Sequence, residues 1–573
     1  MTTNPREQQH RAATSSMSVR RPKKLIVCCD GTWADSDNSW VKGKRGQPGH
    51  PAFPTNVARI ARAIKPEDDD HHPQITYYQA GIGTGLGVYN HVVGGGTGLG
   101  LAVHVREAYA FLASNYSEHE SVIPPDSIFL IGFSRGAYTA RSLGGFICAM
   151  GILKRQAMAH FYEIFEDWVK AGDPKHEPVF FKNYFQHHTD VKEIHPDYRL
   201  SKSRKTEERD KYLKDYFSKL EALGLTQKAY INAIGVWDTV GALGIPVNPI
   251  LQKAFPFLPS FFRSYKWYDT RLDDQMRNAF QALALDERRF PFSPAIWENN
   301  PDHPTNLQQV WFPGSHSDVG GSYPDSGIAN MTLAWMMDRL SGNMVEDRSK
   351  FHHRDWIQFD EDRIGLWYDC QLAGYQTHKR DKYRPWALGK ISDSNTFPHY
   401  LLGKRTRQPG RNFASFYGSG RVNRERPLVH TSEQIHRSVR RRIEKCGRGV
   451  EPQWDGVIGL GGWHVTPLIQ YAWRHIRKGE ISYDPRRKGH SLHGWSMPVS
   501  LEEPDDITDG ETVRVKWVWQ GQEGYQPLPE AKLGRYEMKF FQQCNKNEME
   551  RKNIFESASS PSGRVNSLHG RTF

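Results

Sequence analysis

Residues Gly132-Phe133-Ser134-Arg135-Gly136 form a G-x-S-x-G pentapeptide, the pattern that sets a nucleophilic serine on a sharp turn between a strand and a helix. The backbone at such a serine is strained, so the residues two positions before and after it must be small. Both are glycine here. The pentapeptide alone is a weak signal in a chain with 50 Gly. Its context strengthens it, because an apolar run precedes it at 127–131 and a helix-like pattern follows. We therefore predict that Ser134 is the nucleophile of a serine hydrolase.

A serine hydroxyl needs a base within hydrogen-bond reach and an acid that orients the base. In hydrolases with this elbow, the acid and the base follow the serine in the order Ser, Asp, His. Asp238 follows a strand-like run that ends at Val236, and His316 follows one that ends at Phe312. We predict these two residues as the acid and the base.

Position alone leaves other interpretations of these residues open. Asp238 could be an ordinary helix cap or turn residue. His316, one of 25 histidines, could be an ordinary surface or core histidine. Asp318 and Asp286 are rival acids. Asp318 lies two residues from His316, which suits it better to shaping the turn than to completing a triad.

Acyl transfer also needs donors aimed at the developing oxyanion, and the loss of one donor typically costs about 100- to 1000-fold in rate. The backbone N–H of Arg135 is the expected first donor. The second is expected from a loop after an early strand, where Gly31 and Thr32 are the candidates. Asp30 precedes them. It could brace this loop or hold a nearby arginine, and a bracing role is at least as well supported by the sequence as a direct catalytic one.

The elements that must position these residues alternate between strand and helix. Such alternation over residues 24–345 predicts a mostly parallel sheet covered by helices on both faces, an α/β-hydrolase-like fold. Sites in such sheets form at the carboxyl ends of the strands. Asp30, Ser134, Asp238 and His316 each follow a strand-like run, so we expect them to meet at one edge of the sheet. The predicted strands are 24–29, 75–78, 127–131, 229–236 and 308–312.

Five strings then give the sequence a specific resemblance. They are CDGTW (29–33), GIGTG (81–85), GFSRGAYTAR (132–141), VWDTVGALG (236–244) and PGSHSDVGGSY (313–323). In order and spacing they resemble the catalytic domain of type VI secretion phospholipase effectors and their fungal relatives. The resemblance covers about residues 23–345, and it implies an α/β-hydrolase-like fold with Ser134, Asp238 and His316 as the triad. One departure is GGSY, where the family leads us to expect a third glycine. Membership implies ester hydrolysis more firmly than a phospholipid substrate.

The sequence also suggests a division of the chain. We expect a disordered basic leader at 1–22, a catalytic domain at 23–345, a mixed, loop-rich C-terminal extension at 346–549 and a disordered tail at 550–573. Within the catalytic domain, a charged helical insertion is expected at about 153–225. The Phe- and Pro-rich stretch 245–264 is either a lid or an ordinary buried loop.

Composition narrows the class of protein. The 573 residues carry a net charge of +12, and their 17 Trp, 24 Tyr and 28 Phe can build a sizeable core. The six Cys form no CxxC pair or disulfide framework, and neither a secretory signal nor a membrane-length apolar run is evident, so we expect a cytoplasmic protein. No H-E-x-x-H or phosphate-loop spacing occurs, the glycine-dense segment 81–100 included, so we expect no metal and no cofactor.

Two functions from different classes follow. The first is a serine hydrolase that cleaves carboxylic esters, of phospholipids or of small acyl metabolites, through an acyl-Ser134 intermediate. The second is a catalytically silent binding or scaffold protein that uses its basic surface to contact lipid or nucleic acid. Its best support is the arginine run 440–442, in a basic helix that follows a capping-box spacing of Thr431 and Gln434. Contact with an anionic membrane fits the basic charge, nucleic acid is not expected for the enzyme, and the sequence leaves the oligomeric state open.

Overall fold

The computed structural model describes a large part of the chain, with gaps. Residues 1–20, most of the glycine-dense segment, the stretch 245–264 and the tail 550–573 lie outside it, so the expectations for them stay predictions. The described residues are 21–31, 40–41, 50–51, 53–81, 98–117, 124–171, 173, 176–197, 206–240, 272–289, 292–299, 305–345, 351–361, 386–387, 389, 391–392, 394, 407–418, 421–444, 491–492, 495–496, 516–519 and 528–544.

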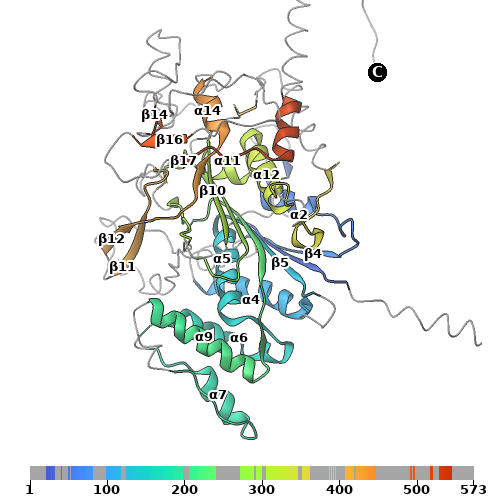
Figure 1. Cartoon of the computed structure of the whole chain (residues 1–573), viewed down its shortest axis with the longest axis vertical. Coiled ribbons are helices and arrows are strands. Elements are labelled where there is room, and N and C mark those ends of the chain that lie inside the picture. Colours follow the sequence, from blue (N-terminus) through green and yellow to red (C-terminus); the bar gives the residue numbers. More distant parts are fainter. Residues whose placement is uncertain are drawn as a thin grey trace, which may run out of the picture.

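A seven-stranded sheet forms the centre of the described structure (Figure 1). Its strands lie in the order β13-β10-β9-β8-β5-β1-β4, and every neighbouring pair is parallel. This confirms the predicted α/β fold with a mostly parallel sheet. The strands are β1 (Lys24–Cys29), β4 (Gln74–Gln79), β5 (Ser127–Phe133), β8 (Ile231–Trp237), β9 (Asn278–Ala284), β10 (Asn306–Phe312) and β13 (Glu433–Ile435).

Both faces of the sheet are buried. Along β1, Leu25 and Val27 point into one apolar cluster, while Ile26 and Cys28 point into the other. A strand that is covered on both faces reads as a continuous apolar run, which is why the periodicity of 24–29 showed no polar face. The helices α4 (Gly98–Asn115) and α5 (Ser134–Met150) cover the first face, and α2 (Asn56–Ala63) and α12 (Gly327–Leu340) cover the second.

The strand order reverses next to β1. The chain passes from β1 through α2 to β4 on one side, and then through α4 to β5 on the other side of β1. In open α/β sheets, ligands bind in the crevice outside the carboxyl ends of the strands at such a reversal. The topology therefore places a site where Asp30 follows β1 and Ser134 follows β5.

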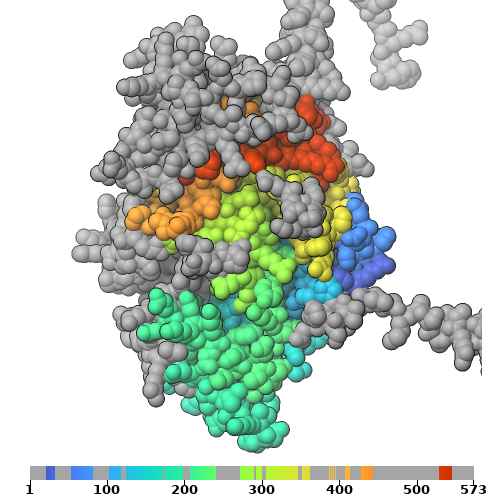
Figure 2. Space-filling model, viewed as in Figure 1, coloured from blue at the N-terminus to red at the C-terminus, as the bar shows by residue number. Residues whose placement is uncertain are grey.

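A helical insertion separates α5 from β8. It forms a projection beside the sheet, seen in green at the bottom of Figures 1 and 2. Aromatic side chains fill its interior, among them Phe161, Trp168 and Tyr216, which are at most 6% exposed. The insertion contains β6 (Ile152–Leu153), η1 (Arg155–His160), α6 (Phe161–Val169), α7 (Phe180–His187), α9 (Thr206–Ala222) and β7 (Thr226–Gln227).

Parts of the C-terminal extension pack on the same core. β13 is the edge strand of the central sheet, next to β10. The helix 535–544 lies against α12, where buried Arg339 pairs with Glu537 at 2.9 Å. The boundary near residue 345 thus divides the sequence but not the core. The remaining elements are β2 (Trp40–Val41), β3 (His50–Pro51), α11 (His316–Gly320), η5 (His353–Asp355), β11 (Phe413–Gly418), β12 (Arg421–Pro427), α14 (Arg437–Glu444), β14 (Ser491–Leu492), β15 (Trp495–Ser496), β16 (Lys516–Trp519) and β17 (Leu528–Pro529).

Strand β9 was not predicted. One local expectation was wrong, because the spacing of Thr431 and Gln434 does not cap a helix. Gln434 instead lies within β13, the Thr431 hydroxyl donates to Glu433 at 2.9 Å, and the basic helix α14 begins only at Arg437. None of the helices in the described ranges is long and apolar enough to cross a bilayer.

Candidate active site

Ser134 stands at the sharp turn between β5 and α5. Its φ of 58° lies in the left-handed region, which is costly for a residue with a side chain. A Cβ on Gly132 would lie 2.6 Å from Ala137 Cα, and one on Gly136 would overlap the carbonyl oxygens of Cys29 and Asp30. Both glycines therefore let strand and helix approach closely enough to form the predicted elbow.

Asp238 follows β8 directly and is completely buried. Its φ is 40°, a second left-handed residue at this edge of the sheet. Its backbone N–H donates to Ala282 O at 2.7 Å, and its Oδ1 accepts from the Ala284 N–H at 3.0 Å. These bonds to the end of β9 fix the carboxylate at the carboxyl edge of the sheet.

His316 begins the short helix α11, just after β10. Ser315 caps this helix in a capping box, in which the Ser315 side chain accepts from the backbone of Asp318 and Asp318 accepts from the Ser315 backbone at 2.8 Å. The turn before it needs glycine, since Gly314 has a φ of 110°. The loop geometry thus presents the imidazole toward the elbow.

The structure brings these three side chains together. His316 Nε2 lies 2.7 Å from Ser134 Oγ, and His316 Nδ1 lies 2.6 Å from Asp238 Oδ2. A carboxylate accepts but cannot donate, so Nδ1 carries the proton and Nε2 is free to accept from the serine hydroxyl. All three residues are buried, with Ser134 the most exposed at 7%.

The pKa values of Asp238 and His316 are both lowered at this site. Burial acts to raise the pKa of Asp238, but the charge of Arg407 and the bond to His316 outweigh it and hold that pKa well below its usual value. Burial lowers the pKa of His316, and the bond to Asp238 only partly opposes this. The arrangement favours an ionised aspartate beside a neutral imidazole at neutral pH.

The imidazole is also held from its sides. The ring of Phe133 lies 4.7 Å from it between centroids, and the ring of Phe292 lies 4.9 Å away at 77°. Glu287 accepts from the His316 backbone N–H at 3.2 Å. Burial opposes ionisation of Glu287, yet its bond to Arg289 lowers its pKa to about 2. A second fixed negative charge therefore lies next to His316.

The two rival acids serve the turn instead. Asp318 belongs to the capping box of α11, and burial raises its pKa to about 7. Asp286 accepts from the Gly314 N–H at 2.6 Å. In this structure the carboxylate on the His316 Nδ1 is that of Asp238.

Two of the expected oxyanion donors, Arg135 and Gly31, lie close to Ser134. The Arg135 N–H is in the first turn of α5, the positive end of the helix dipole. A Cβ on Gly31 would lie 3.4 Å from Ser134 Cβ. The Gly31 N–H donates to Asp30 Oδ1 at 2.6 Å, however, so this structure departs from the prediction that it faces an oxyanion. Thr32 lies outside the described residues.

Asp30 has the expected bracing role. Its carboxylate accepts from the Thr55 hydroxyl, the N-cap of α2, at 2.7 and 2.9 Å. It also accepts from the Tyr78 hydroxyl at 2.7 Å. These bonds join the loop after β1 to α2 and β4.

Arg407 is the site residue that sequence analysis missed. Its guanidinium donates to both oxygens of Asp238, to Oδ2 at 3.0 Å. It comes from the loop-rich extension, and in a chain with 76 Lys and Arg no motif distinguishes it. Only its position in the folded chain reveals this contact.

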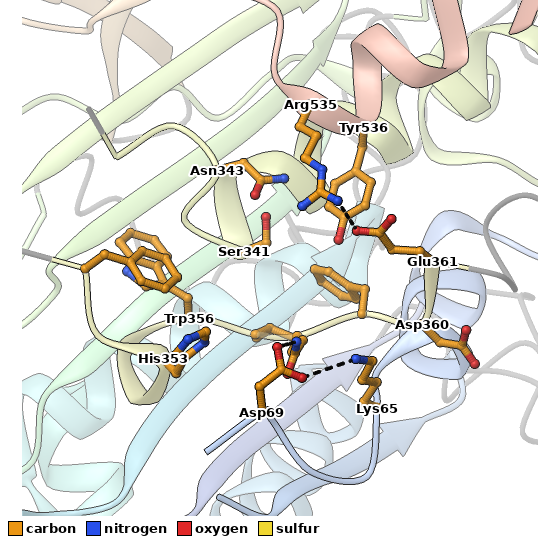
Figure 3. A pocket seen from close by; sticks show the side chains of 14 residues that line it. Lys65, Asp69, Ser341, Asn343, His353, Trp356, Asp360, Glu361, Arg535 and Tyr536 are labelled. Carbon is orange, nitrogen blue, oxygen red and sulfur yellow. Dashed lines mark hydrogen bonds and ion pairs between the residues drawn. The ribbon is translucent and has the colours of Figure 1, made fainter. Parts of the chain in front are cut away.

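A pocket of about 580 Å³ lies away from this site (Figure 3). It adjoins the amino ends of β1 and β4, where Lys24 donates to Trp356 O at 2.6 Å, whereas Ser134 lies at the carboxyl ends. Charged side chains that line it pair with one another, as Arg535 does with Glu361 at 2.9 Å. The described part of the chain holds no cluster of three His, Cys, Asp or Glu side chains suited to a metal ion.

One curated protein and two solved structures are similar to this chain. A curated relative, the uncharacterized protein YEL023C of Saccharomyces cerevisiae, is 24% identical over 286 residues, which are 47% of this chain and 32% of the relative. The chain thus spans about a third of that relative's length.

Two solved structures are also similar. One, the Tle1 effector bound to the VgrG spike from the type VI secretion system, is 17% identical over 54% of this chain and 53% of its own, with a TM-score of 0.26. The other, an uncharacterized protein from Pseudomonas aeruginosa, is 14% identical over 66% of this chain and 56% of its own, with a TM-score of 0.28.

The chain also matches the model of a protein family. Residues 23–339 match the family described as "T6SS, Phospholipase effector Tle1-like, catalytic domain". This match covers more than half of the chain and includes Ser134, Asp238 and His316. The chain belongs to the family of Tle1-like phospholipase effector catalytic domains.

Proposed function

We propose that this protein is a serine hydrolase that cleaves carboxylic ester bonds of lipids through an acyl-Ser134 intermediate. The observation that carries the proposal is the position of His316, within hydrogen-bond reach of both Ser134 and Asp238. Such an arrangement on a strained strand-to-helix elbow can activate a serine hydroxyl.

In the acylation step, the Ser134 Oγ attacks the carbonyl carbon of the ester while His316 Nε2 takes the hydroxyl proton. The charge that forms on the imidazolium is stabilised by Asp238. When the tetrahedral intermediate collapses, the bond from the carbonyl carbon to the alcohol oxygen breaks. His316 gives its proton to that oxygen, the alcohol leaves, and the acyl group remains on Ser134.

The deacylation step repeats this sequence with water. His316 Nε2 takes a proton from the attacking water, and the same proton then returns to Ser134 Oγ as the acyl bond breaks. A free carboxylic acid leaves. The net reaction is the hydrolysis of one ester with one water, and it needs no cofactor.

Backbone donors stabilise the oxyanion in both steps. Arg135 supplies the first N–H, and Gly31 or Thr32 supplies the second. For Gly31 this requires that its bond to Asp30 give way when substrate binds. Two donors aimed at the oxyanion are each worth about 100- to 1000-fold in rate.

Lipid esters are the favoured substrate class because the family to which the chain belongs is described by its phospholipase effectors. The phenyl rings of Phe133 and Phe292 pack beside His316, and the Arg289 guanidinium lies 3.5 Å from the centroid of the Phe292 ring.

The test compares the wild type with Ser134→Ala and with Ser142→Ala, a matched serine in the same helix. A fluorophosphonate probe should label the wild type and Ser142→Ala but not Ser134→Ala. A panel of phospholipids and simple esters, read by mass spectrometry, should show fatty acid release that is lost with Ser134. Equal product from wild type and Ser134→Ala would exclude the proposed mechanism.

The alternative of a silent scaffold with a basic surface gains no support from α14. Arg440 pairs with Glu530 at 2.9 Å. Arg442 is 1% exposed and donates to the carbonyls of Ala387 and Gly389. Two of the three arginines in the run 440–442 thus serve the packing of the extension rather than a solvated face.

A further inference from the structure

We propose that Arg407 is a positioning residue, which holds the Asp238 carboxylate in the orientation that His316 requires. The inference rests on the proposed function, because it assigns Arg407 a role in the same triad. It also extends that triad beyond residues 23–339, the part of the chain that matches the family.

The first support is geometry. The two terminal nitrogens of Arg407 each donate to a different oxygen of Asp238, so the pair is bidentate. The same nitrogens donate to the carbonyls of Ala284 at 2.7 Å and Phe292 at 2.6 Å. The guanidinium is therefore fixed by the end of β9 and by the segment whose Phe292 ring packs on His316.

The second support is burial. The Asp238 side chain is 0% exposed and the Arg407 side chain 2%. An unpaired charge buried this deeply is strongly destabilising, so each group needs the other. Asp238 Oδ2 accepts from both Arg407 and His316, which leaves the carboxylate little freedom to rotate.

The third support is the anchoring of Arg407 itself. Three residues later, the Gly410 N–H donates to Glu433 at 2.8 Å. Glu433 is the first residue of β13 and also accepts from the Trp311 indole of β10 at 2.8 Å. The segment that carries Arg407 is thus tied to the sheet edge next to the strand that leads to His316.

A positive charge at this place has two opposite effects. It keeps Asp238 ionised, but it also weakens the support that the carboxylate gives to an imidazolium. The other charged groups that act on the His316 imidazole are Asp238, Glu287 and Arg289. Removal of the Arg407 charge should therefore misplace the carboxylate and make His316 easier to protonate.

The experiment uses the full-length chain and the variants Arg407→Gln and Arg407→Lys. The rate of fluorophosphonate labelling at Ser134 is measured from pH 5 to pH 9, with saturation kinetics that separate probe binding from reaction. For Arg407→Gln we expect the reaction rate to fall roughly tenfold to a hundredfold, with little change in probe binding. The acid limb of the profile should move to higher pH. Arg407→Lys keeps the positive charge but not the paired N–H donors of a guanidinium. Its reaction rate should therefore lie between those of the wild type and Arg407→Gln.

Arg442→Gln is the matched control, since Arg442 is an equally buried arginine of the extension that donates to backbone carbonyls and not to Asp238. It should lower the thermal midpoint while the pH profile of its folded protein stays that of the wild type. In ¹H NMR, the deshielded proton of the His316–Asp238 bond should shift in Arg407→Gln and not in Arg442→Gln.

Two results would overturn the role of Arg407. One is a folded Arg407→Gln with the wild-type rate and pH profile. If Arg407→Gln does not fold, the second such result is an Arg407→Lys variant with the labelling rate and pH profile of the wild type. Failure of the proposed function looks different, because the wild type itself would then not be labelled at Ser134 or would hydrolyse esters without that residue.

Discussion

Gly136 lies directly against the carbonyl oxygen of Cys29, so close that a Cβ at Gly136 would overlap it. The contact joins the first turn of α5 to the end of β1, the two elements at the reversal of strand order. It holds Ser134 next to the loop of the expected oxyanion donors. The position of Ser134 thus depends on a backbone contact that no side chain makes.

We expect Gly136→Ala to disrupt the elbow. The added methyl group must push α5 away from β1, at a cost of about 3 kcal/mol or more. Thermal unfolding should show a much lower midpoint, and the folded protein should lose labelling of Ser134.

Gly145→Ala in the same helix is the control. A Cβ there would meet only Trp168, at an ordinary 3.5 Å. Alanine is the better helix former, so this variant should be more stable by about 0.5–1 kcal/mol and label normally. A Gly136→Ala protein as stable and reactive as Gly145→Ala would show that the close approach is not needed.

Asp238→Asn should abolish most of the activity although it changes few atoms. An amide at this position can turn its NH₂ toward His316 and impose the wrong tautomer, an effect worth about 10⁴-fold in kcat in a related triad. It also leaves Arg407 buried without its anion, so the thermal midpoint should fall. Steady-state ester hydrolysis and circular dichroism on the same samples separate the two effects.

Asp318→Asn tests the rival acid. Asp318 caps α11 and has no contact with the imidazole among its described hydrogen bonds. We expect its kcat to stay within about threefold of wild type. The opposite outcome, a severe loss in Asp318→Asn with a mild one in Asp238→Asn, would reassign the acid.

The pH dependence of kcat/KM should report the state of His316. Only the neutral imidazole can accept the serine proton, so the rate must fall as pH drops through its pKa. Burial places that pKa below the ordinary value of about 6.5, so the half-maximal rate should lie below that pH.

Glu287→Gln provides a signed check on this assignment. The negative charge of Glu287 raises the pKa of His316, so its removal should move the acid limb to still lower pH. That shift is opposite to the one expected for Arg407→Gln. Shifts of the same sign in both variants would mean that the limb belongs to another group.

Much of this site could be predicted because short local sequence patterns indicate its residues. The elbow glycines, the apolar runs and the turn around His316 each carry a signal within about ten residues. The parallel sheet then follows from the alternation of strand and helix, and it puts Ser134, Asp238 and His316 at one edge.

The parts that were missed depend on distant contacts. β9 reads NAFQALA, which has no β-branched residue and becomes a strand because it is buried between β8 and β10. β13 has three residues, too few to show a periodic pattern in the sequence. It forms because it pairs with the outer edge of β10. Arg407 meets a carboxylate 169 positions away in the sequence.

The last prediction concerns Ser322, the serine of the GGSY turn. Ser322 has a φ of 86°, a left-handed conformation that favours glycine, and family resemblance leads us to expect glycine at this turn. Ser322→Gly should relieve this strain, and after the entropy that glycine adds to the unfolded chain the gain should be about 0.5–1 kcal/mol. The thermal midpoint should rise while labelling of Ser134 stays unchanged. Ser326→Gly is the control, because Ser326 has a φ of −100° and gains nothing from glycine. A midpoint that falls equally in both variants would show that Ser322 is held by its contacts and not strained by its backbone.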